Sequence, residues 1–267
     1  MSSATPLSAL FEKTKRENRA ALIGYVPAGF PSVEQCLDVV KSMVAGGVDA
    51  IEIGFPYSDP VMDGPIIQAA ADQSLKNGTG ASEVLSTVKE VASLNVPVVV
   101  MTYWNPIERF GAPAFAKAIA EAGGSGVITP DLTIEEAGSW RSAVKESAIN
   151  SIFVVAPSTK DSRLASVTSE CSGFIYAASL MGVTGTRTSV SSQAKDLVER
   201  IRKVSATPIA VGLGVSTPDQ ANEVAKYADG VIVGSAFIRQ IQEAATFEDG
   251  LKRVEELARS LAHGVRR

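Results

Sequence analysis

Residues 96–129 read VPVVVMTYWNPIERFGAPAFAKAIAEAGGSGVIT, and this stretch contains one complete unit of the fold. It begins with an apolar run rich in valine, Val96–Thr102, continues through the alanine-rich helical pattern Ala112–Ala122, and ends in a second apolar run, Gly126–Thr129. Strands that are apolar on both faces are typical of a parallel sheet covered by helices on each side. The stretch therefore predicts a strand–helix–strand unit with parallel strands.

The same alternation extends along the whole chain of 267 residues. We predict eight strands, at Ala21–Val26, Ala50–Ile53, Val96–Thr102, Gly126–Thr129, Ser151–Val155, Gly173–Ala177, Pro208–Val211 and Gly230–Val233. Helical patterns lie between and after them, at Val33–Ala45, Ala81–Leu94, Ala112–Ala122, Ile134–Lys145, Ser162–Ser169, Ser191–Val204, Asp219–Tyr227 and from about Phe237 to His263. One more helix is expected to open at Thr5-Pro6, because proline suits the first helical position.

Eight strand–helix units in 267 residues give about 33 residues per unit, which is the length of a β–α repeat. The simplest closed arrangement is a single (β/α)8 barrel domain over residues 1–267, an α/β fold preceded by an extra N-terminal helix. The alternative is an open doubly wound sheet, whose first strand is followed by a glycine-rich GxGxxG turn. The sequence at that point, Val26-Pro27-Ala28-Gly29-Phe30-Pro31, is too rich in proline for such a turn.

Composition excludes several classes of function. Lys and Arg number 25 against 29 Asp and Glu, so the net charge of −4 gives no basic footprint for nucleic acid. There is no apolar run of membrane-spanning length and no signal-peptide pattern. Cys36 and Cys171 lie far apart without a CxxC motif, which fits a reducing cytoplasm. Since the one histidine, His263, lies in a polar tail, acid–base chemistry is expected to use carboxylates, lysine or tyrosine.

Glu52 is a carboxylate embedded in the apolar run of the second predicted strand. By alternation it shares a face with Ala50 and Gly54, two small residues that suit the interior of a barrel. A carboxylate in an apolar setting is costly unless it is paired or its pKa rises. Glu52 is therefore a candidate acid–base group, although a glutamate that reaches solvent at the strand end would show the same pattern.

A second carboxylate follows in the proline-rich loop after this strand. Asp59-Pro60 and Asp63-Gly64-Pro65 are typical of turns, and Asp63 could also cap a helix that opens at Pro65. A stiff loop that places a carboxylate eleven residues beyond Glu52 can equally aim it into the same pocket. We therefore predict that Asp63 is a second acid–base group.

Glycine-rich segments follow the three last strands: Gly182-Val183-Thr184-Gly185-Thr186, Gly212-Leu213-Gly214 and Gly234-Ser235, where a helix begins. Barrels of this type commonly bind phosphate with the loops after strands seven and eight and a helix N-terminus. Backbone N–H groups supply the donors without any lysine or arginine. The substrate is therefore expected to carry a phosphate group.

Three other polar or aromatic positions lie near strand ends. Tyr176, in the sixth strand, is either a core residue with a satisfied hydroxyl or a hydrogen-bonding group at the barrel mouth. The segment Tyr103-Trp104-Asn105 is expected to end the third strand. Asp131 ends the fourth strand, and we favour for it a helix-capping role ahead of Leu132–Glu135.

The run from Ile51 to Pro60 with Asp63-Gly64-Pro65, the three glycine-rich segments and Tyr103-Trp104-Asn105-Pro106 together resemble the tryptophan synthase α subunit family. The resemblance covers nearly the whole chain, from about Leu10 onward. It implies a single (β/α)8 barrel that cleaves indole-3-glycerol phosphate to indole and glyceraldehyde 3-phosphate in tryptophan biosynthesis, a carbon–carbon lyase reaction that requires no metal or organic cofactor in this chain.

The resemblance also implies roles for individual residues. Glu52 and Asp63 are the implied catalytic pair: Glu52 moves protons at indole C3 and at the glycerol hydroxyl, and Asp63 takes or stabilises the proton on the indole nitrogen. Tyr176 is implied to lie beside Glu52. The residues implied to line the indole pocket are Leu22, Met101 and Ile128. Thr184 is implied to take part in loop closure over the substrate. The residues implied to bind the phosphate are Gly185, Gly212, Gly214, Gly234 and Ser235.

A partner is implied in the same way. Family members dock on a β subunit that carries pyridoxal phosphate, in an α2β2 heterotetramer, and indole passes to it through an internal tunnel under allosteric control. Asp59 and Asn105 match segments that dock on the partner. Two other possibilities remain at the level of the residues: another phosphate-binding barrel enzyme, for which a strand lysine or metal-binding histidines are expected, or a regulatory subunit without its own chemistry.

Overall fold

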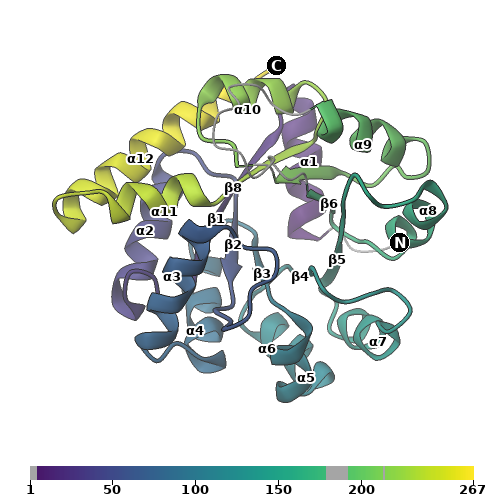
Figure 1. Ribbon diagram of the computed structural model, residues 1–267, viewed down its shortest axis with the longest axis horizontal. Helices are drawn as coiled ribbons and strands as arrows, with labels where there is room; N and C mark the ends of the chain where they lie inside the picture. Colours follow the sequence, from purple (N-terminus) through teal and green to yellow (C-terminus); the bar gives the residue numbers. More distant parts are fainter. Residues whose placement is uncertain (1–4, 179–191, 213) are drawn as a thin grey trace.

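The computed structural model describes residues 5–178, 192–212 and 214–267. Within these ranges eight strands form one closed parallel barrel (Figure 1). Each strand pairs with the next in sequence, and the last pairs back to the first, with Leu22 opposite Val231. This closure confirms the (β/α)8 barrel, since the first and last strands of an open sheet have no such pairing. The strands are β1 (Ala21–Pro27), β2 (Ala50–Gly54), β3 (Val98–Met101), β4 (Gly126–Thr129), β5 (Asn150–Val155), β6 (Ile175–Ala178), β7 (Ile209–Gly212) and β8 (Gly230–Val233).

Helices surround the barrel on its outer side (Figure 1). The region from Phe237 to His263, expected to be one helical stretch, is divided into two helices that pack against each other. The second begins where the Thr246 hydroxyl accepts a hydrogen bond from the Asp249 N–H at 3.1 Å. The helices around the barrel are α2 (Val33–Ala45), α3 (Pro65–Lys76), α4 (Ala81–Ala92), α5 (Trp104–Phe110), α6 (Ala112–Glu121), α7 (Gly138–Glu146), α8 (Asp161–Ser169), α9 (Ser192–Arg202), α10 (Pro218–Ala225), α11 (Ser235–Gln242) and α12 (Phe247–Gly264).

The extra helix α1 (Pro6–Arg16) closes the N-terminal end of the barrel. Thr5 caps it by accepting a hydrogen bond from the Ser8 N–H at 3.2 Å, as the Thr-Pro start predicts. Its buried face, which includes Leu7 and Phe11, joins the side chains inside the barrel in one cluster. The Phe11 ring centroid lies 5.8 Å from that of Phe174. This closed N-terminal end is the floor of the barrel, and the barrel is open at the opposite end.

The residues that connect α1 to β1 lie beside the C-terminal residues of the described chain, at this same end of the barrel. The Ala20 N–H donates to the Val265 carbonyl at 3.0 Å, and the Arg267 N–H donates to the Asn18 carbonyl at 3.2 Å. These contacts lie next to the start of β1, the strand that pairs with β8.

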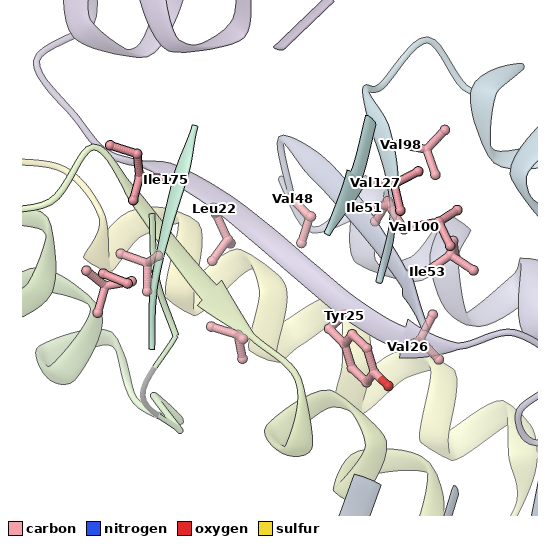
Figure 2. Packing of buried hydrophobic residues seen from close by; sticks show 14 of the residues in the cluster. Leu22, Tyr25, Val26, Val48, Ile51, Ile53, Val98, Val100, Val127 and Ile175 are labelled. Carbon is pink, nitrogen blue, oxygen red and sulfur yellow. The ribbon is translucent and has the colours of Figure 1, made fainter. Parts of the chain in front are cut away.

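Side chains alternate between the inside of the barrel and the surrounding helices, because successive residues of a strand point to opposite faces. Ala50, Val99 and Ile232 belong to the inner cluster. The other face is continuous with the helices, and Figure 2 shows its members from neighbouring strands gathered together, among them Ile51, Ile53, Val98, Val100 and Val127. Glu52 shares its parity with Ala50 and is 1% exposed, so it points into the barrel, as the alternation predicted. No helix in the described parts of the chain is long and apolar enough to cross a membrane.

Candidate active site

A cavity of about 610 Å³ opens at the C-terminal ends of the strands. Glu52 of β2, Asp63 of the β2–α3 loop and Tyr176 of β6 all line it, together with residues that the sequence did not single out. None of the lining residues in the described chain is Lys, Arg or His. Its walls are largely apolar, with a few carboxyl, hydroxyl and backbone groups, which suits a flat apolar molecule with polar substituents.

Glu52 lies in this cavity without a partner for one of its carboxyl oxygens. Its Oε2 atom is buried and has no hydrogen bond within the described chain. Burial, and to a smaller extent the nearby Asp63 carboxylate, raise the pKa of Glu52 to about 8. A carboxyl group with such a pKa is mostly protonated at pH 7, so it can donate a proton and take one back.

Asp63 lies at the end of its loop, directly before the N-cap of α3, and does not cap that helix. Gly64 occupies the N-cap position of α3 and no side chain caps that end, so the capping role considered for Asp63 is absent. The backbone carbonyl of Asp63 accepts a hydrogen bond from Gln68 Nε2 at 2.8 Å. Partial burial raises the pKa of Asp63 to about 6, so at pH 7 this carboxyl is mostly ionised.

Two tyrosines flank the carboxyl pair, and each depends on a glycine of a neighbouring strand. A Cβ atom on Gly54 would lie 2.3 Å from the Tyr25 hydroxyl, and one on Gly212 would lie 2.4 Å from the Tyr176 hydroxyl. Both positions therefore exclude any larger residue while the rings stay in place. Burial and the two carboxylates raise the pKa of both tyrosines, which keeps the hydroxyls protonated as hydrogen-bond donors.

The comparisons with known proteins agree with one another. Residues 11–266 match the family model described as "Tryptophan synthase alpha chain". The chain is 53% identical to the tryptophan synthase alpha chain of Streptomyces coelicolor, over 94% of this chain and 93% of that protein. The corresponding protein of Thermobifida fusca is also 53% identical, over 98% of both. The chain belongs to the tryptophan synthase alpha chain family.

Solved structures point to the same family. The structure of Mycobacterium tuberculosis tryptophan synthase superposes with a TM-score of 0.92 at 46% identity, covering 99% of this chain and 100% of that one. An alpha chain from Legionella pneumophila superposes with a TM-score of 0.89 at 31% identity, covering 98% of both. As a family member, the chain is an indole-3-glycerol-phosphate lyase of tryptophan biosynthesis, a carbon–carbon lyase. The other barrel enzymes and the purely regulatory subunit are thereby set aside.

The residues expected to surround the indole ring do not all line the cavity. Met101 lines the cavity, and Ile128 belongs to the inner cluster beside it. Leu22, which was also expected there, is fully buried and is not among the residues that line the cavity. Gly24, two residues on and of the same parity, faces Met43 of α2, so this face of β1 points away from the cavity.

Tyr25 is the residue of β1 that lines the cavity, and it was not predicted from the sequence. It is opposite Glu52 in the register of β1 and β2, and it is 7% exposed. It lines a cavity that also holds the Glu52 and Asp63 carboxyl groups. The signal in the sequence was its place two residues before Pro27, at the C-terminal end of the strand.

The glycine-rich segments contribute to the same end of the barrel where they are described. Gly212, Gly214, Gly234 and Ser235 line the cavity, and Ser235 is the first residue of α11. Thr184 and Gly185 lie outside the described residues. The β5–α8 loop, 156–158, also lines the cavity and was not anticipated.

The segment expected to end the third strand begins a helix instead. Tyr103 is the N-cap of α5, and Trp104 and Asn105 form its first turn. Asn105 is exposed and its Nδ2 donates to the Tyr57 hydroxyl at 2.9 Å. Asp59 is exposed as well, and its carboxylate accepts from the Ser58 hydroxyl at 2.6 Å. Both residues expected to dock on the partner thus lie at the surface around the cavity mouth.

Asp131 also differs from expectation. The residues after it form turns, and the next helix, α7, begins only at Gly138, so Asp131 does not cap a helix of its own segment. Its two carboxylate oxygens instead lie 2.9 and 3.1 Å from the Trp104 N–H, at the first turn of α5.

Proposed function

We propose that Glu52 and Asp63 are the two groups that cleave indole-3-glycerol phosphate in this chain. The observation that carries the proposal is the difference between their environments: the pKa of Glu52 is raised to about 8 and that of Asp63 to about 6. Between these two values Glu52 holds a proton while Asp63 is ionised. Two carboxyl groups with separated pKa values can serve as acid and base in one site at neutral pH.

The cleavage follows from these protonation states. Glu52 donates its proton to C3 of the indole ring, and the positive charge that develops reaches the ring nitrogen, where the Asp63 carboxylate stabilises it or accepts the nitrogen's proton. The Glu52 carboxylate then takes the proton of the hydroxyl on the glycerol carbon attached to C3. The carbon–carbon bond breaks, its electron pair returns to the ring, and the hydroxyl carbon becomes the aldehyde of glyceraldehyde 3-phosphate. If Asp63 has taken the proton of the ring nitrogen, it returns that proton as the electron pair arrives. Glu52 ends protonated, as it began.

The remaining lining residues are proposed to hold the substrate. Tyr25, Met101 and Tyr176 provide apolar area for the indole ring, and the two hydroxyls are available to its polar substituents. The phosphate is proposed to bind backbone N–H groups around Gly214, Gly234 and Ser235. The start of α11 adds the partial positive charge of a helix N-terminus. Thr184 and Gly185 keep their predicted roles in loop closure and phosphate binding.

The chain is proposed to act with a partner, as the solved tryptophan synthase of M. tuberculosis indicates for its relative. We propose a β subunit that carries the pyridoxal phosphate, an α2β2 assembly, and docking through the surface that includes Asp59 and Asn105. The chain itself is proposed to function as one domain in the cytoplasm.

Release of indole from indole-3-glycerol phosphate tests this proposal directly. We expect cleavage that increases on addition of the β subunit and is lost in Glu52→Gln and Asp63→Asn. Asp38→Asn, which changes an exposed carboxylate on α2 in the same way, is the matched control and should keep the wild-type rate. Full activity in either site variant, in protein that folds normally, would show that the assigned carboxyl group is not required.

A further inference from the structure

Asp131 connects two parts of the barrel mouth that are far apart in sequence. It follows β4, and its carboxylate accepts a hydrogen bond from the Trp104 N–H, at 2.9 Å from one oxygen and 3.1 Å from the other. Trp104 is the first residue of α5, which follows the neighbouring strand β3. A carboxylate at this point satisfies a free N–H group and interacts favourably with the helix dipole.

The first residues of α5 in turn hold the loop that carries Asp63. The Tyr103 hydroxyl accepts a hydrogen bond from the Met62 N–H at 3.1 Å, and Met62 directly precedes Asp63. Earlier in the loop, the Tyr57 ring packs on the Tyr103 ring with centroids 5.2 Å apart. Asn105 donates to the Tyr57 hydroxyl at 2.9 Å. The loop is therefore fixed to the start of α5 at two places.

We propose that Asp131 is a positioning residue for Asp63. By fixing the first turn of α5, it sets the place of the Tyr103 hydroxyl, which sets the place of Met62 and so the aim of the carboxylate that follows. The inference rests on the proposed catalytic role of Asp63. Asp131 itself is exposed and does not line the cavity, so any effect on the reaction passes through these contacts.

The rest of α5 is anchored independently of Asp131. Ile107 is fully buried, and the Phe110 ring lies 5.6 Å from the Phe115 ring. Loss of the Asp131 carboxylate is therefore expected to leave the helix folded and to release only its first turn. Displacement of a reacting group by about 1 Å can lower a rate by about 100-fold. A small shift of Tyr103 is thus sufficient to impair turnover.

Three variants test the inference by steady-state indole release. Asp131→Leu keeps the approximate size of the side chain and removes the acceptor, so we expect kcat to fall by about tenfold while KM stays within about twofold, because Asp63 acts in the chemical step. Asp131→Asn keeps an acceptor oxygen and should restore kcat to within about threefold of wild type. Tyr103→Phe should also lower kcat, and Asp131→Leu should then add less than its own full factor.

Thr5→Val is the matched control, because it also removes a side-chain acceptor at a helix N-terminus, but beneath the floor of the barrel. It should leave kcat unchanged. The inference is overturned if Asp131→Leu keeps the wild-type kcat, if Asp131→Asn and Asp131→Leu are equally impaired, or if the two losses multiply fully in the double variant.

Amide hydrogen exchange provides a readout that does not need turnover. Exchange across residues 57–64 should accelerate in Asp131→Leu and in Tyr103→Phe, and should be unchanged in Thr5→Val. If wild-type protein releases no indole, the proposed function fails, and the exchange result still decides whether Asp131 holds the loop. Unchanged exchange in Asp131→Leu would overturn the inference in either case.

Discussion

Replacing Glu52 by glutamine is expected to change how the stability of the fold depends on pH. Glu52 is 1% exposed, and burial with the nearby Asp63 carboxylate raises its pKa from 4.5 to about 8. Between these two values the folded state binds a proton that the unfolded chain has released. The free energy of unfolding therefore falls as the pH rises through this window, and it levels off above the folded-state value. Glutamine does not titrate, so the variant should lack this dependence.

The size of the effect follows from the two pKa values. Treating the unfolded chain as unshifted, the carboxyl lowers the free energy of unfolding by about 1 kcal/mol at pH 5, about 3 kcal/mol at pH 7 and about 5 kcal/mol at pH 9. The glutamine amide buries hydrogen-bond donors of its own, and these shift the free energy of unfolding of the variant by the same amount at every pH. The change with pH of the difference between the two proteins is the meaningful quantity.

Urea unfolding at pH 5, 7 and 9, followed by circular dichroism and tryptophan fluorescence, measures this difference. We expect the stability advantage of Glu52→Gln over wild type to grow by about 4 kcal/mol from pH 5 to pH 9. Asp38→Asn, at an exposed position, should show no such growth. A difference between Glu52→Gln and wild type that stays constant over this range would refute the assignment of a raised pKa to Glu52.

Two further predictions concern activity. The kcat for indole release should rise through about pH 6, as Asp63 ionises, and fall through about pH 8, as Glu52 loses its proton; a profile that is flat from pH 5 to 9 would contradict this. Gly212→Ala should lower kcat/KM by about tenfold, because the new Cβ atom would meet the Tyr176 hydroxyl at 2.4 Å. Tyr176→Phe should recover part of that loss, and wild-type kinetics for Gly212→Ala alone would show that the ring moves aside freely.

The order of the elements could be predicted because the barrel makes every strand apolar on both faces. β4 and β8 have the predicted bounds, and so does α2. The start of α5 was less visible, because Tyr103 and Trp104 favour strands as readily as helices when only the local sequence is considered. The break between α11 and α12 was missed for a similar reason: the apolar pattern continues on both sides of it.

The orientation of β1 is harder to predict from the sequence than that of β2. All residues from Ala21 to Pro27 are buried, so no polar residue marks which face of the strand points into the barrel. In β2 the single carboxylate of Glu52 gave that mark, and its orientation was predicted correctly. For β1 the family resemblance implied Leu22, whereas the residue that lines the cavity is Tyr25, which differs in parity.

The role of Asp131 could not be predicted from the residues next to it in the sequence. It lies 27 positions after the N–H group that it binds. The two residues meet only because β3 and β4 are neighbours in the barrel and present their following loops at the same end. Sequence order alone suggests that Asp131 caps the helix that follows it. In the closed barrel it binds instead the N-terminus of α5, which precedes it in the chain.

Closure of the barrel through β1 and β8 has a consequence for the synthesis of the chain. β1 leaves the ribosome long before its second partner β8, which ends at Val233, and the contact between Asn18 and Arg267 forms later still. Until then β1 and the most recently made strand each present an unpaired edge, a state prone to wrong pairing with other chains. A growing chain of this kind gains from anything that shields those two edges, and the risk ends in one step when the last strand arrives.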